Sequence, residues 1–76
     1  MNNLETSLDA TIAIAKAELA NATESAWFFE RNMKRLESEG KWKSADMAFG
    51  WMTQAKNECK KLERVIAKLV AARAEA

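Results

Sequence analysis

The sequence predicts an all-α protein, an antiparallel two-helix hairpin that we expect to dimerise into a four-helix bundle. Apolar residues recur at alternating intervals of three and four along both halves of the chain, which is typical of helices packed at a shallow angle. The chain has no proline and two glycines, too few turn residues for a β-rich protein. At 76 residues we expect a single helical-hairpin domain, residues 1–76.

The first helix is predicted at about residues 3–38. Asn2, with Glu5 three residues later, has the spacing of a capping box at the helix start. Gly40 suits the left-handed residue just past a helix C-terminus. The residues expected to face the second helix form one apolar seam: Leu8, Ile12, Ala15, Leu19, Ala22, Ala26, Phe29, Met33 and Leu36.

The second helix is predicted at about residues 44–74, with Ser44 as its N-cap and Asp46 in its first turn. Trp42 is then a loop residue, which we expect to fold back over the end of the core; the alternative is that it stacks on a nucleic-acid base or touches an acidic partner surface. It lies among the basic side chains of the tip: Arg31, Lys34, Arg35, Lys41 and Lys43. A short loop makes the helices antiparallel and pairs residues whose numbers sum to about 81. The second seam consists of Ala45, Ala48, Met52, Ala55, Cys59, Leu62, Ile66 and Leu69.

Three aromatic residues, Trp27, Phe28 and Phe29, stand in a row. Successive helical residues are about 100° apart, so Phe29 can occupy the seam while the other two point away from it. In the predicted register Phe49 and Trp51 lie at the same height, with Trp27 and Phe49 on one flank and Phe28 and Trp51 on the other. The hairpin thus carries an aromatic girdle that its own helices do not cover.

Two interpretations of this girdle remain open. In the first, it is the core of a homodimer, completed by an outer apolar stripe on the first helix that includes Ile14 and Ala20. In the second, part of it is a binding patch for another protein. Gly50 either lets a helix or ligand approach closely, or marks a kink or a helix that begins again. The predicted interface residues are Ile14, Ala20, Trp27, Phe28, Phe49, Gly50 and Trp51.

A basic stripe on the second helix is the candidate nucleic-acid contact: Lys56, Lys60, Lys61, Arg64 and Lys68. The plasmid copy-number regulator Rop is an antiparallel hairpin dimer that binds paired RNA loops. The predicted architecture of this chain resembles that of Rop, but the two share no residue motif. The net charge is only +1, and Glu58 and Glu63 interrupt the stripe. A solvated helix face is the simpler interpretation.

The composition argues against catalysis and metal binding. The chain has no histidine, no tyrosine and one cysteine, so it lacks both the usual acid–base group and the ligands of a structural zinc site. We expect no enzyme activity, no metal and no cofactor, with Cys59 a small buried hydrophobic residue. Without a signal-like or membrane-spanning segment, the expected location is the cytoplasm, with no membrane partner.

The sequence therefore favours a small non-enzymatic protein–protein interaction module that binds a target protein and modulates it, with inhibition the expected direction. Short helical dimers of this kind are frequent among phage and mobile-element proteins. The alternatives are a Rop-like nucleic-acid-binding regulator that uses the second helix, and a purely structural oligomerisation module.

Overall fold

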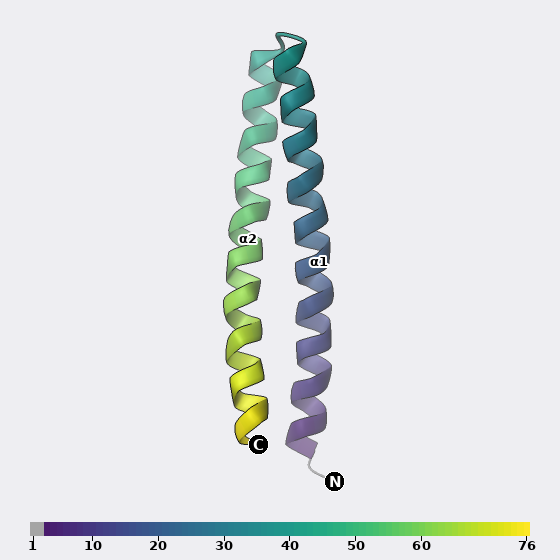
Figure 1. The fold of residues 1–76 in the computed structure, drawn as a ribbon, viewed down its shortest axis with the longest axis vertical. Coiled ribbons are helices and arrows are strands. Elements are labelled where there is room, and N and C mark those ends of the chain that lie inside the picture. The colour runs from purple at the N-terminus through teal and green to yellow at the C-terminus, as the bar shows by residue number, and fades with distance from the viewer. Residues whose placement is uncertain (1–2) are drawn as a thin grey trace.

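The computed structural model describes residues 3–76 as two helices, α1 (Asn3–Ser38) and α2 (Trp42–Glu75), which lie antiparallel along their whole length (Figure 1). The hairpin is a rod of 59 × 14 × 12 Å with a radius of gyration of 17.1 Å. A compact domain of this length has a radius of gyration of only about 11 Å. The described chain therefore exposes much more surface than a globule of the same size.

The predicted all-helical fold with two packed helices is confirmed, and so are the seams. Every seam residue named above is buried or half-buried. Contacts across the hairpin confirm the register: the Thr23 Oγ1–Cys59 Sγ distance is 3.6 Å, and Arg73 Nε donates to Asp9 Oδ1 at 2.7 Å. The residue numbers of both pairs sum to about 81, as the loop position predicted.

The loop between the helices is a Schellman motif centred on Gly40. Gly40 has a φ of +73°, and its N–H donates to the Glu37 carbonyl at 3.0 Å. The Lys41 N–H donates to the Leu36 carbonyl at 2.9 Å. This bonding pattern satisfies the last carbonyls of α1 and requires a left-handed residue, which glycine adopts without strain. The predicted role of Gly40 is confirmed, whereas the capping box at Asn2 lies outside the described residues.

The predicted start of the second helix is wrong by two residues. α2 begins at Trp42, directly after Lys41, and no side chain caps it. The Lys41 carbonyl accepts the Ala45 N–H at 2.9 Å, so the Schellman turn leads straight into the next helix and Ser44 is not the cap. Trp42 lies in the first turn of α2 and is 64% exposed. The prediction that Trp42 folds back over the end of the core is therefore wrong.

The core is one thin layer of mostly small side chains. Its main cluster lies beside the loop and consists of Leu36, Ala45 and Ala48, with Met33 packed against it. No side chain in residues 3–76 is both large and fully buried. Neither α1 nor α2 contains a stretch long and apolar enough to span a membrane.

An ion-pair cluster closes the open end of the hairpin. Arg73 of α2 reaches two carboxylates of α1, with Nε 2.7 Å from Asp9 Oδ1 and a terminal nitrogen 3.5 Å from Glu5 Oε1. The hydrogen bond that Arg73 donates to Asp9, together with the charges of Asp9 and Glu5, raises the pKa of Arg73. The Schellman turn and this cluster therefore hold opposite ends of the rod.

Candidate protein-binding surface

One flank of the hairpin is marked by the ion pair between Lys56 Nζ and Glu30 Oε1, 3.7 Å apart. Trp27 lies three residues before Glu30, and Phe49 seven residues before Lys56, so both share this flank with the ion pair. Trp42 lies a further seven residues before Phe49. We call this surface the Trp27 flank, and define it by Trp27, Glu30, Trp42, Phe49 and Lys56. Its three aromatic side chains are all more than half exposed.

The opposite flank carries a chain of aromatic contacts. The ring centroids of Phe29 and Trp51 are 5.6 Å apart, and those of Phe28 and Phe29 are also 5.6 Å apart, in an edge-on arrangement. Ile14 lies fourteen residues before Phe28, and Val65 fourteen residues after Trp51, so heptad spacing extends the flank toward the open end. We call this surface the Trp51 flank, and define it by Ile14, Ser25, Phe28, Phe29, Trp51 and Val65.

Each flank contains a groove between the helices. The groove on the Trp51 flank has a volume of about 340 Å³ and is lined by Ala22, Ser25, Phe29, Trp51, Gln54, Ala55 and Glu58. The groove on the Trp27 flank is smaller, about 230 Å³, lies at the tip, and is lined by Met33, Glu37, Trp42, Ala45, Asp46 and Phe49. The first contains one charged side chain and the second contains two carboxylates. The division of the girdle between two flanks is as predicted.

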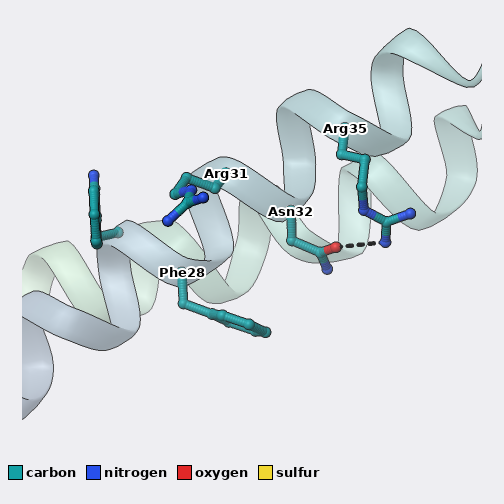
Figure 2. A pocket seen from close by; sticks show the side chains of 5 residues that line it. Phe28, Arg31, Asn32 and Arg35 are labelled. Carbon is teal, nitrogen blue, oxygen red and sulfur yellow. Dashed lines mark hydrogen bonds between the residues drawn. The ribbon is translucent and has the colours of Figure 1, made fainter.

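A third groove, of about 530 Å³, lies on the surface of α1 alone and is lined by Trp27, Phe28, Arg31, Asn32 and Arg35 (Figure 2). The guanidinium carbon of Arg31 lies 4.9 Å from the centroid of the Trp27 ring, a cation–π arrangement. Arg31 makes no ion pair within residues 3–76, so its charge is available to a partner. Phe28 points away from Arg31, and the two side chains form different walls of the groove.

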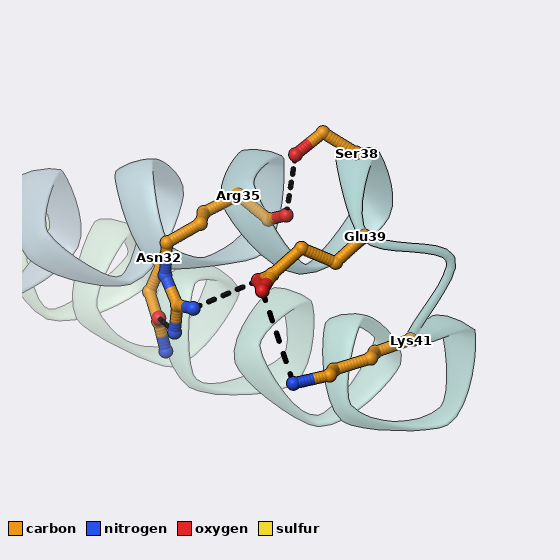
Figure 3. Close-up of polar contacts among 5 residues, drawn as sticks. All are labelled: Asn32, Arg35, Ser38, Glu39 and Lys41. Atoms are coloured by element: carbon orange, nitrogen blue, oxygen red, sulfur yellow. Dashed lines mark hydrogen bonds and ion pairs between the residues drawn. The ribbon is translucent and has the colours of Figure 1, made fainter.

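Arg35 is held in place by its neighbours (Figure 3). Its guanidinium donates to Asn32 Oδ1 and to Glu39 Oε2, each at 2.8 Å. Lys41 Nζ lies 3.8 Å from Glu39 Oε1, and the Ser38 hydroxyl donates to the Arg35 carbonyl at 2.6 Å. The sequence interpretation counted Arg31 and Arg35 only as part of a basic tip. Arg31 lies four residues after Trp27, and Arg35 lies four residues before Glu39. This spacing is the sequence signal for the stacking of Arg31 on Trp27 and for the ion pair of Arg35 with Glu39.

The remaining predicted interface residues are exposed. Ile14 is 61% exposed, and Ala20 is also exposed. Gly50 lies within an unbroken α2, and a Cβ atom added to it would meet nothing within 4 Å. The alternative in which a helix begins again at Trp51 is therefore wrong. The part of these residues in an interface stays a prediction.

The basic stripe on α2 divides in two. Lys56 pairs with Glu30 of α1. The other members are exposed and form no ion pair in the described chain: Lys60, Lys61, Arg64 and Lys68. Lys60, Arg64 and Lys68 follow one another at intervals of four, which aligns them along the outer side of α2.

The described residues offer little for chemistry. Within residues 3–76, no group of three or more histidine, cysteine, aspartate or glutamate side chains is placed to hold a metal ion. Cys59 is a free thiol, half-buried rather than buried, with Thr23 Oγ1 at 3.6 Å. Comparison of the chain with protein-family models, with curated proteins and with solved structures gives no match. The exposed aromatic side chains of the two flanks are therefore the main candidate functional feature of residues 3–76.

Proposed function

We propose that this chain is a non-enzymatic protein–protein interaction module that self-associates into a four-helix bundle, binds a target protein through exposed aromatic side chains, and inhibits it. The observation that carries the proposal is the amount of apolar surface left uncovered. Within residues 3–76, ten large hydrophobic side chains are between 41% and 64% exposed, among them Trp27, Phe28 and Trp42. Tryptophan and other aromatic residues are the typical anchors of protein interfaces.

The total accessible area supports the same conclusion. The hairpin exposes 5683 Å², whereas a compact monomer of 8.5 kDa exposes about 4,700 Å². The excess, roughly 1,000 Å², is close to the area that each partner buries in a standard protein–protein interface, about 800 Å². The chain therefore has as much uncovered surface as one stable interface requires.

The target site is best assigned to the tip half of the Trp27 flank. Trp27 and Phe49 stand on opposite helices there, joined at one edge by the Lys56–Glu30 ion pair. Arg31, stacked on Trp27, adds a positive charge that no residue of the described chain neutralises. A target that fits this surface presents an apolar side chain to the aromatic rings and a carboxylate to the guanidinium.

The experiment is affinity capture from a lysate of the organism that encodes the chain, with and without nuclease. The matched bait carries Trp27→Ala and Phe49→Ala, two exposed side chains whose loss leaves the helical seam intact. We expect a protein that survives nuclease on wild-type beads and is lost from the variant beads. Equal retention by both baits would contradict the proposal. With the captured target in hand, inhibition of its activity by wild type and not by the variant tests the direction of the effect.

Nucleic-acid binding is the second candidate, favoured by the aligned and unpaired Lys60, Arg64 and Lys68. Three cations along one side of a helix are suited to contact phosphates. Reversal of Lys60, Lys61 and Arg64 to glutamate abolishes binding of this kind and leaves an aromatic protein interface largely unchanged. Captured material that disappears with nuclease and with this charge reversal would replace the protein-target proposal. Self-association with no retained partner would instead indicate a purely structural module.

A further inference from the structure

We propose that a second copy of the chain packs on the Trp51 flank, which leaves the Trp27 flank and the tip free for the target. This inference rests on the proposed function, because it divides one aromatic girdle between two tasks. In an isologous dimer each copy presents the same surface to the other. The Trp51 flank of one hairpin therefore covers the Trp51 flank of its partner.

The position of the groove on the Trp51 flank suits a symmetric dimer. Its α1 residues run from Ala22 to Phe29, a little nearer the tip than the midpoint of α1, which spans Asn3–Ser38. Beyond the groove, Ile14 and Val65 continue the exposed apolar surface toward the open end, at the same height on the two helices. The groove on the Trp27 flank lies at the extreme tip, where a second rod would leave most of its own length uncovered.

The distribution of charged side chains also favours the Trp51 flank as the dimer interface. Charged side chains are depleted at the centres of protein interfaces because they lose their hydration there. The groove beside Trp51 is lined by one charged residue, Glu58. On the Trp27 flank, a covering helix would bury the Lys56–Glu30 ion pair together with the carboxylates that line the tip groove. The less charged flank is the one suited to a permanent partner.

The area of the flank matches what a second copy requires. A face 59 Å long and 14 Å wide has a projected area of roughly 800 Å², about the amount that each partner buries in a standard interface. Trp51 is 46% exposed while its ring packs on Phe29, so one side of the indole is already fixed. A second copy gains contact with a preordered aromatic surface and loses little side-chain freedom.

The test is sedimentation equilibrium of the wild-type protein and of two tryptophan variants. Trp51→Ala removes the centre of the proposed interface, and we expect its dimer dissociation constant to rise about tenfold or more. Trp42→Ala is the matched control, since it removes the same side chain from the same helix on the opposite flank. We expect its dissociation constant to stay within about twofold of wild type.

A second pair of variants guards against loss of folding in Trp51→Ala. Ser25→Glu places a charge on an exposed position of the Trp51 groove, and Thr53→Glu places one beside Phe49, whose carbonyl accepts the Thr53 hydroxyl at 2.9 Å. Glutamate is compatible with a helix, so we expect both variants to stay helical, and circular dichroism verifies this. We expect Ser25→Glu alone to weaken the dimer, by about tenfold or more.

Two results would overturn the inference. The first is a wild-type chain that stays monomeric at concentrations well above micromolar, where standard interfaces associate. The second is a dimer that Trp42→Ala and Thr53→Glu weaken as much as their counterparts on the Trp51 flank. Capture of the target by wild-type beads and not by the Trp27→Ala, Phe49→Ala bait is measured separately. A monomer that still captures the target refutes this inference and the self-association part of the proposed function, and leaves target binding standing. A dimer that captures nothing refutes target binding and leaves the Trp51-flank interface standing.

Discussion

Gly50 lies inside α2, a position where glycine destabilises a helix by about 1 kcal/mol relative to alanine. The structure shows no contact that requires it: an added Cβ meets nothing within 4 Å, and its φ is not in the left-handed region. It also lies on the outer side of α2, off both helical seams. Gly50→Ala is therefore expected to raise the free energy of unfolding by about 1 kcal/mol, which raises the Tm by about 4–8 °C for a domain of this size.

Thermal unfolding followed by circular dichroism measures this change, with wild type and variant at the same concentration because the proposed dimerisation would make the Tm concentration-dependent. Scans at two concentrations, one above and one below the dimer dissociation constant, separate the hairpin from its assembly. An unchanged or lower Tm at the higher concentration would refute the reasoning. Another backbone would then lie against Gly50 in the assembled protein, and the dimer interface would include the outer side of α2 rather than the Trp51 flank alone.

Three further changes test the loop, the core and the open end. Gly40→Ala is expected to lower the free energy of unfolding by about 1–2 kcal/mol, because alanine disfavours a φ of +73°. Gly40→Asn is expected to lower it by less, because asparagine tolerates the left-handed region better. Urea unfolding compares the two variants, and equal losses would contradict the explanation from the backbone φ angle. Ala48→Leu overpacks a side chain that is 1% exposed and is expected to cost about 1–3 kcal/mol, whereas the exposed control Ala20→Leu stays within about 0.5 kcal/mol; similar unfolding midpoints would contradict the burial of Ala48. Arg73→Gln is expected to speed amide hydrogen exchange at the start of α1 and the end of α2, and unchanged exchange there would show that the ion pairs contribute nothing. Because the pKa of Arg73 is raised, its contribution is not weakened as the pH rises through neutrality and is lost on the alkaline side only in strong alkali.

The fold followed from the sequence because one strong pattern determined it. An unbroken three–four alternation of apolar residues specifies which face of each helix is covered, and Gly40 specifies where the chain turns. Those two facts fix the register, so that Phe29 meets Trp51 and Cys59 meets Thr23. The division of the aromatic girdle into two flanks followed from helical geometry alone.

The details that the sequence did not yield depend on competition between local structures. Ser44 is a good cap by type, but the Schellman turn at Gly40 leads into a helix two residues earlier, and the backbone bonds of that turn outweigh one side-chain cap. The Arg73 cluster and the stacking of Arg31 on Trp27 depend on how long side chains settle on a surface. Such arrangements contribute little energy each, and so leave little trace in the pattern of residue types.

The position of the core cluster beside the loop has a consequence for how the chain folds. Leu36, Ala45 and Ala48 are joined by a short connection, so little chain entropy is lost when they first meet. Each later contact lies one turn further from the loop and needs no new loop closure. We therefore expect the contacts between the helices to form in order from the tip to the open end. Substitutions near Ala48 are then expected to slow folding, while those near Arg73 mainly speed unfolding. The surface assigned to the target is thus formed first, before the open end of the rod has closed.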